Sequence, residues 1–114
     1  MSFIRRVGYA LSGIRSAFRH ERNLQIQAVI GLCVIIIAIM IHVSLTHFMI
    51  ILILVAGVIS LELINTAIER AVDLISTELH PLARAAKDIA AGAVLWFSIF
   101  SAIIGFMIIF TTLQ

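Results

Sequence analysis

The stretch FMIILILVAGVISLELINTAIERAVD, residues 48–73, changes character along its length. Residues 48–64 are apolar apart from Ser60 and the single charged side chain of Glu62, whereas Asn65, Glu69 and Asp73 follow within three turns. With some fraying at its ends, an apolar run of this kind can cover the roughly 20 residues that a bilayer core requires. We therefore expect a membrane-spanning helix that leaves the lipid with an acidic face.

Two more apolar stretches flank this one. Residues 28–45 are interrupted only by His42 and Ser44, and residues 89–113 carry no charge. The chain has 114 residues, of which 62% are hydrophobic and 12% charged, and a soluble domain of this size needs far more polar surface. The sequence predicts one all-α integral membrane domain, residues 1–114, with three transmembrane helices within about 26–45, 48–74 and 84–112.

The basic residues predict the topology. Arg5, Arg6, Arg15, Arg19 and Arg22 precede the first span, and Arg70, Arg84 and Lys87 lie between the second and third. The link at 41–47 and the tail at 111–114 contain no lysine or arginine. Because positive charge accumulates on the cytoplasmic side, we expect the N-terminus inside, the C-terminus outside and a location in the bacterial cytoplasmic membrane.

Residues 1–23 have the pattern of an amphipathic helix. The apolar positions recur at spacings of three and four: Phe3 or Ile4, Val7, Leu11, Ile14 and Phe18. Arginines occupy other faces, which suits a helix lying in the membrane surface with its cations toward anionic headgroups. A helix packed on the protein's own bundle fits the same pattern, and the two interpretations are compatible.

The spacing of the polar residues in the second span places them on one helix face. Glu62, Asn65, Glu69 and Asp73 fall within roughly 80° of one another along about 16 Å of helix axis. A carboxylate in hydrocarbon costs several kcal/mol unless it is paired or neutralised. A metal ion, lysine or arginine must therefore face this acidic stripe. Lys87 is the best cation within the chain, and Glu21, at the foot of the first span, can add a further carboxylate.

Carboxylates gathered with a lysine suit a site for Mg²⁺ and phosphates. Glu62 also has the depth at which a carboxylate meets a lipid hydroxyl and takes its proton. Intramembrane carboxylates equally serve proton relays and small proton-coupled transporters, or hold helices together, and spacing alone leaves these alternatives open. Internal repeats, which many transporters show, are not visible, and neither GxxxxGK[ST] nor GxGxxG occurs. No nucleic-acid partner is expected.

Two stretches resemble the prokaryotic diacylglycerol kinase and undecaprenol kinase family. They are ELINTAIERAVD at residues 62–73 and HPLARAAKDIAAGAVL at residues 80–95, with the specific motifs E-x-x-N-[ST]-A-I-E-x-x-V-D and A-K-D. GYALSGIRSAFRHERN, residues 8–23, is similar to the start of that family. The resemblance covers nearly the whole chain, and it implies a homotrimer that transfers the γ-phosphoryl group of ATP to a lipid hydroxyl with Mg²⁺. Three helices are too few to enclose both substrates, so a site shared between subunits is expected.

The resemblance implies a role for each matching residue. Glu62 matches the catalytic base of the family, and Asn65 matches an active-site asparagine near the transferring phosphate. Glu21 and Glu69 match metal-binding carboxylates of the nucleotide site. The other matches to the nucleotide site are Lys87 on the ATP phosphates, its neighbour Asp88, Tyr9, and the segment Glu78, Leu79 and His80. Asp73 matches the acid that ends the first motif, whose role is either catalytic or structural.

The resemblance also bears on the lipid. HPLARAAKD with its Pro81, and ERN at residues 21–23, are more similar to the undecaprenol branch of the family. Ala91 stands where the diacylglycerol branch usually has a serine, and Gln27 stands where that branch has a glutamate. Undecaprenol is therefore the favoured substrate, with diacylglycerol as the alternative.

Overall fold

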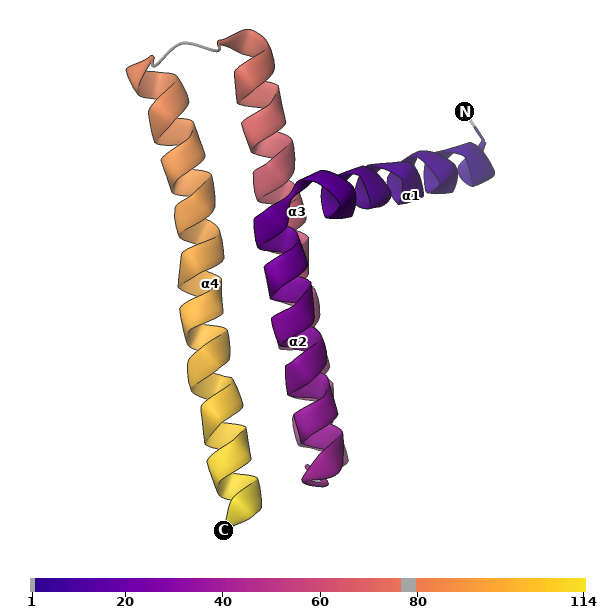
Figure 1. Ribbon diagram of the computed structural model, residues 1–114, viewed down its shortest axis with the longest axis vertical. Coiled ribbons are helices and arrows are strands. Elements are labelled where there is room, and N and C mark those ends of the chain that lie inside the picture. The colour runs from indigo at the N-terminus through magenta and orange to yellow at the C-terminus, as the bar shows by residue number, and fades with distance from the viewer. Residues whose placement is uncertain (1, 77–79) are drawn as a thin grey trace.

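The computed structural model describes residues 2–76 and 80–114, and the regular elements in these ranges are all helices. The helices are α1 (Phe3–His20), α2 (Arg22–Met40), α3 (Leu45–Ile75) and α4 (Pro81–Leu113). Helices α2, α3 and α4 run side by side, while α1 projects away from them (Figure 1). Of these, α2, α3 and α4 are long and apolar enough to cross a membrane. The predicted all-α fold with three candidate spans is confirmed.

Helices α3 and α4 are longer than a bilayer core. With 31 and 33 residues and a rise of 1.5 Å per residue, they extend about 46 and 50 Å, whereas the hydrocarbon core is about 30 Å thick. Their extra turns continue past the level of α1, on the side of the link between α3 and α4 (Figure 1). The polar residues of the acidic stripe lie in the half of α3 that leads to this end.

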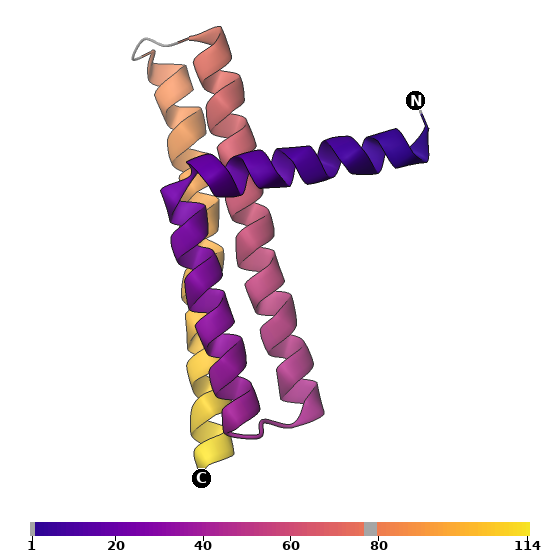
Figure 2. The same cartoon turned by 45° about the vertical axis from the view of Figure 1, so that its right-hand side comes forward.

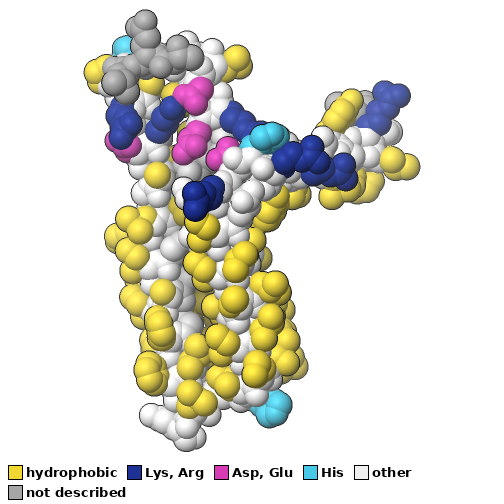
Figure 3. All heavy atoms as spheres, in the orientation of Figure 1, with side chains coloured by type: hydrophobic (Ala, Val, Ile, Leu, Met, Phe, Trp, Pro, Cys, Tyr) yellow, Lys and Arg dark blue, Asp and Glu magenta, His cyan; other side chains and the backbone are white. Residues whose placement is uncertain are grey.

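The side chains divide the molecule into a charged end and an apolar body. Lysines, arginines and acidic side chains lie on α1 and on the nearby turns of the bundle, and hydrophobic side chains cover the rest of the visible face (Figure 3). Large apolar residues of the body, such as Ile53 and Phe106, are 68% and 61% exposed. Exposed apolar surface on this scale requires lipid or another subunit around it.

Helix α1 has the expected amphipathic character. Most of its large apolar residues are exposed, with Phe3 and Ile4 more than three-quarters uncovered, and arginine and hydrophobic side chains lie on different sides of the helix in Figure 3. In the part of the chain that the structure describes, α1 reaches the bundle with its end next to α2 (Figures 1 and 2). The apolar face of α1 is therefore not buried against its own chain, which favours the interpretation of a helix in the membrane surface.

The boundaries of α2 differ from the expected range of about 26–45. The helix begins at Arg22, because the extended backbone of Glu21 (φ −106°, ψ 109°) breaks α1 there and α2 starts at once. It ends at Met40, where His42 turns the chain with a φ of 59° in the left-handed region. Ser44 then caps α3 by accepting a hydrogen bond from the His47 backbone N–H at 3.2 Å, which satisfies one free donor of a helix start.

Two glycines allow the three long helices to approach closely. A Cβ atom at Gly31 would lie 2.7 Å from Val55 Cγ1, and one at Gly57 would lie 2.6 Å from the ring of Phe97. The first contact joins α2 to α3 and the second joins α3 to α4. Small residues at such crossings let membrane helices pack by van der Waals contact, which drives helix association in lipid.

Replacement of Gly57 tests the packing of α3 on α4. Because the added methyl group would overlap the Phe97 ring, Gly57→Ala should lower the free energy of unfolding in mixed micelles by about 1–3 kcal/mol. Gly92→Ala is the matched control, since a Cβ there meets nothing within 4 Å. The double variant Gly57→Ala/Phe97→Leu should recover part of the loss. Equal stability of Gly57→Ala and the control would contradict the close crossing.

Candidate active site

The acidic stripe begins at the most deeply buried charged residue of α3. Glu62 is 7% exposed, and the charged groups that act on it electrostatically are Glu69 and Glu21. Thr66, itself 5% exposed, donates its hydroxyl hydrogen to the Glu62 carbonyl at 2.9 Å. This bond satisfies the buried hydroxyl within the helix, so Thr66 places no further donor on the carboxylate of Glu62.

Asn65 and Glu69 form the middle of the stripe. Asn65 Nδ2 donates to Glu69 Oε1 at 3.2 Å. The other polar atom of this amide, Asn65 Oδ1, is buried and has no hydrogen-bond partner among the described residues. A buried oxygen without a donor carries a free-energy penalty, so a cation or a hydrogen-bond donor from a ligand would be stabilised at this point.

The outer end of the stripe meets the cation that the sequence predicted. Lys87 Nζ on α4 lies 2.5 Å from Asp73 Oδ1 on α3. This ion pair joins the two helices above the apolar body, so Lys87 faces the stripe at its outermost acid rather than at its deepest. One turn earlier on α4, Arg84 Nε lies 3.3 Å from Asp88 Oδ1, an i,i+4 pair on an exposed helix surface.

Glu21 approaches the stripe from the joint between α1 and α2. Its Oε1 lies 3.8 Å from Arg70 Nη2, and Arg70 Nη1 donates to Ser16 Oγ at 3.3 Å. Sequence reasoning assigned no site role to Arg70, Ser16 or Thr66. The sequence contained one indication that Arg70 belongs to the site. It is a cation that directly follows Glu69, on a helix whose polar face is otherwise acidic.

The remaining predicted site residues are more scattered. Tyr9 is 64% exposed on the projecting part of α1, so a single chain does not bring it to the stripe. His80 caps α4, since its Nδ1 accepts a hydrogen bond from the Leu82 backbone N–H at 3.1 Å. Glu78 and Leu79 lie outside the described residues. Among those that are described, no three His, Cys, Asp or Glu side chains gather closely enough to hold a metal by themselves.

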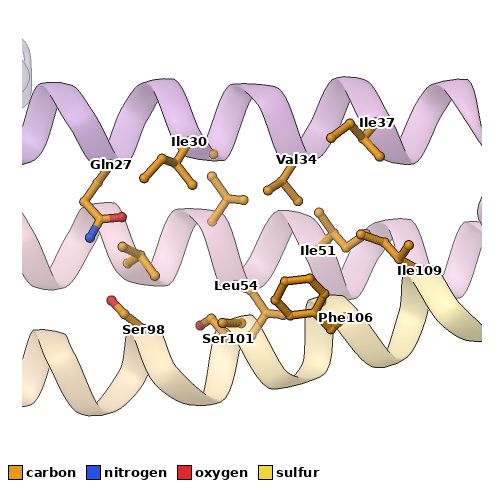
Figure 4. Close-up of a pocket in the computed structure, with 15 residues that line it drawn as sticks. Gln27, Ile30, Val34, Ile37, Ile51, Leu54, Ser98, Ser101, Phe106 and Ile109 are labelled. Atoms are coloured by element: carbon orange, nitrogen blue, oxygen red, sulfur yellow. The ribbon is translucent and has the colours of Figure 1, made fainter.

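A separate cleft of about 380 Å³ lies among the three long helices. Figure 4 shows Gln27 of α2 and Ser98 of α4 at the same end of it, with apolar side chains such as Leu54 and Phe106 along the rest. The hydroxyls of Ser98 and Ser101 are buried there without a hydrogen-bond partner in the described ranges. No charged residue lines the cleft, so the cleft is distinct from the acidic stripe.

Comparison with known proteins agrees with the resemblance seen in the motifs. Residues 8–109 match the model of the prokaryotic diacylglycerol kinase family. The chain is 47% identical to an undecaprenol kinase of Bacillus subtilis over 106 residues, which cover 93% of this chain and 86% of that protein. It is 40% identical to a diacylglycerol kinase of Synechocystis over 85% of this chain and 56% of that protein. A diacylglycerol kinase of Escherichia coli K12 is 34% identical over 81% of this chain and 75% of its own length.

The family match covers all of the stripe, both residues of the Asp73–Lys87 ion pair and the joint at Glu21. The chain thus belongs to the prokaryotic diacylglycerol kinase family and is a lipid kinase.

Proposed function

We propose that this chain transfers the γ-phosphoryl group of ATP to the hydroxyl of undecaprenol and forms undecaprenyl phosphate. The choice of lipid rests on the 47% identity to the undecaprenol kinase of B. subtilis over 93% of the chain. The two diacylglycerol kinases described above are 40% and 34% identical over shorter stretches. ATP is the phosphoryl donor that a kinase family implies.

Glu62 is the proposed general base. It is the most buried acid of α3 and the first charged residue after the apolar stretch of that helix, which suits the depth of a lipid hydroxyl at the membrane surface. The lipid oxygen attacks the γ-phosphorus while its proton passes to the Glu62 carboxylate. Asn65, one turn away and hydrogen-bonded to Glu69 through Nδ2, would orient the transferring phosphoryl group by donating the second N–H of this amide to a phosphoryl oxygen.

Glu69 and Glu21 are the proposed ligands of Mg²⁺. Two carboxylates suffice for this ion, because Mg²⁺ keeps several waters and takes further oxygens from phosphates. Two observations support this fit. Glu69 and Glu21 offer carboxylate oxygens as ligands, and the buried Asn65 Oδ1 has no hydrogen-bond partner among the described residues. Bound there, Mg²⁺ would neutralise charge on the phosphates. The nucleotide site would be completed by Asp88, Tyr9 and the segment 78–80.

Lys87 is the residue that we propose to contact the ATP phosphates. Asp73 then has a structural role, because it forms an ion pair with Lys87. Asp73 holds the ammonium group between α3 and α4 at 2.5 Å, where the lysine is two-thirds buried. An ammonium held in place loses less side-chain entropy when it binds a phosphate. Asp73 would therefore position Lys87 and would not itself touch the nucleotide.

The proposed assembly is a homotrimer with its sites at the cytoplasmic face of the membrane. Two features support more than one copy of the chain per site. The apolar surface of α2, α3 and α4 is exposed, and α1, which carries Tyr9, projects away from the bundle, so one chain leaves both uncovered. The concentration of Lys and Arg at one end of the bundle supports an orientation with that end in the cytoplasm.

A competition experiment tests the substrate. Purified protein in mixed micelles receives radiolabelled ATP, Mg²⁺ and equal amounts of undecaprenol and diacylglycerol, and the labelled lipids are separated. Undecaprenyl phosphate should carry most of the label. A predominance of labelled phosphatidic acid would reassign the substrate to diacylglycerol, and ATP consumption without any lipid product would contradict the kinase function itself.

Replacement of Glu62 tests the general base. Glu62→Gln keeps the shape of the side chain but removes the proton acceptor, so kcat should fall by about 10²–10⁴-fold while ATP binding, measured by titration with a fluorescent analogue, stays within about twofold. Ser60→Ala, an exposed change on the same helix, is the control and should retain full turnover. Normal kcat in Glu62→Gln would remove Glu62 from this role.

Glu69 and Asp73 should respond differently to magnesium. Glu69→Gln removes a proposed ligand and should raise the half-saturating Mg²⁺ concentration by roughly tenfold, as expected for a loss near 1.4 kcal/mol. Asp73→Asn should leave that concentration unchanged and raise the KM for ATP, because the residue contacts Lys87. The same Mg²⁺ titration curve in both variants would count against Glu69 as a ligand.

A further inference from the structure

Within the described residues, α1 reaches the bundle through its end at the joint between α1 and α2, where it contacts α2 and α3 (Figure 2). Glu21 ends α1 and begins α2 with an extended backbone. Ala17 and Leu24 on either side of it are 4% and 0% exposed. Gln25 Nε2 donates to the Phe18 carbonyl at 2.7 Å, which satisfies a free acceptor at the end of α1. The direction of α1 relative to α2 therefore depends on the backbone and the contacts at this joint.

Arg70 is the residue of α3 whose side chain contacts the joint between α1 and α2. Its guanidinium contacts two segments at once, with Nη1 on Ser16 Oγ of α1 at 3.3 Å and Nη2 on Glu21 Oε1 at 3.8 Å. The planar guanidinium group has N–H donors on both terminal nitrogens, which suits such a double contact. A lysine ammonium group does not reproduce this geometry. One residue of α3 thus links the surface helix, the joint and the helix that carries the acidic stripe.

The carboxylate of Glu21 depends on this contact for its direction. Glu21 is the N-cap residue of α2, but its side chain makes no capping hydrogen bond. Arg70 is the cation with which it forms an ion pair. Without that partner the side chain would sample several rotamers, and repulsion from Glu69 and Glu62 would favour those that turn away from the stripe.

We propose that Arg70 is a positioning residue, which fixes the Glu21 carboxylate beside the acidic stripe and sets the direction of α1 relative to α3. The part that concerns Glu21 rests on the proposed function, in which Glu21 binds Mg²⁺. The part that concerns α1 rests on the contacts alone. Because α1 extends away from the joint, a small change of angle at Glu21 displaces its far end by much more.

The first measurement follows α1 without any turnover. Spin labels are attached at Gly8→Cys and Gly92→Cys, where an added side chain meets open space, in a Cys33→Ala background. Labelled chains are mixed with an excess of unlabelled chains before reconstitution, so that the distances measured lie within one chain. Arg70→Gln should broaden the distance distribution, Arg70→Lys should broaden it less, and the control Arg6→Gln, which removes an exposed charge from the far end of α1, should leave it as in the parent.

The second measurement separates positioning of Glu21 from loss of folded protein. In the unlabelled variants, Arg70→Gln should raise the half-saturating Mg²⁺ concentration several-fold while kcat at saturating Mg²⁺ stays close to the parent value. Arg70→Lys should recover part of this shift. A variant that merely folded less well would lower kcat and leave the half-saturating concentration where it was.

Each outcome decides one part of the proposal. An unchanged distance distribution in Arg70→Gln overturns the control of α1, and an unchanged Mg²⁺ dependence overturns the positioning of Glu21. Failure of the proposed role of Glu21 would be recognised separately, because Glu21→Gln would then leave the half-saturating Mg²⁺ concentration at the parent value while the distance measurement still gave its answer.

Discussion

The arrangement of this protein depends on one electrostatic constraint, the Glu62 carboxylate held at the inner edge of an apolar helix bundle. Removal of a carboxylate from water is costly, and the negative charges of Glu69 and Glu21 add to this cost. Compensation must come from cations. The chain supplies Lys87 and Arg70, which pair with Asp73 and Glu21 around the cluster. A divalent ion and its phosphates would complete the balance at the centre, where Asn65 Oδ1 lacks a donor.

The same constraint separates the molecule into two working regions. The apolar cleft among α2, α3 and α4 contains no charge, whereas the ion pairs lie outside it, on α3, on α4 and at the joint between α1 and α2. In the proposed function, hydrocarbon and phosphate would be received at different heights of the same three helices. Glu62 would then lie between the two regions, where a lipid hydroxyl and a nucleotide could meet.

Much of this was predictable from the sequence, because hydropathy and helical periodicity are local properties. The three spans, the amphipathic residues 3–20 and the acidic face of residues 62–73 all follow from composition and spacing. The partner of Lys87 was less accessible, since it depends on how α3 and α4 align across the link at 77–79. Arg70 was missed for a related reason: its partners, Ser16 and Glu21, are about fifty residues away in the chain. The roles of single residues came from family motifs, which spacing alone could not have supplied.

Helix α3 passes from the apolar body into the acidic stripe without a break, from Leu45 to Ile75. A continuous helix is stiff along its axis, so Glu62 has a fixed height above the far end of the span. The depth of the substrate hydroxyl, in contrast, follows the lipids. In a membrane whose hydrocarbon thickness differs from the length of the apolar body, tilting or local thinning must restore the match. With Glu62 as the proposed general base, the geometry of the reaction would in this way be linked to the thickness of the surrounding bilayer.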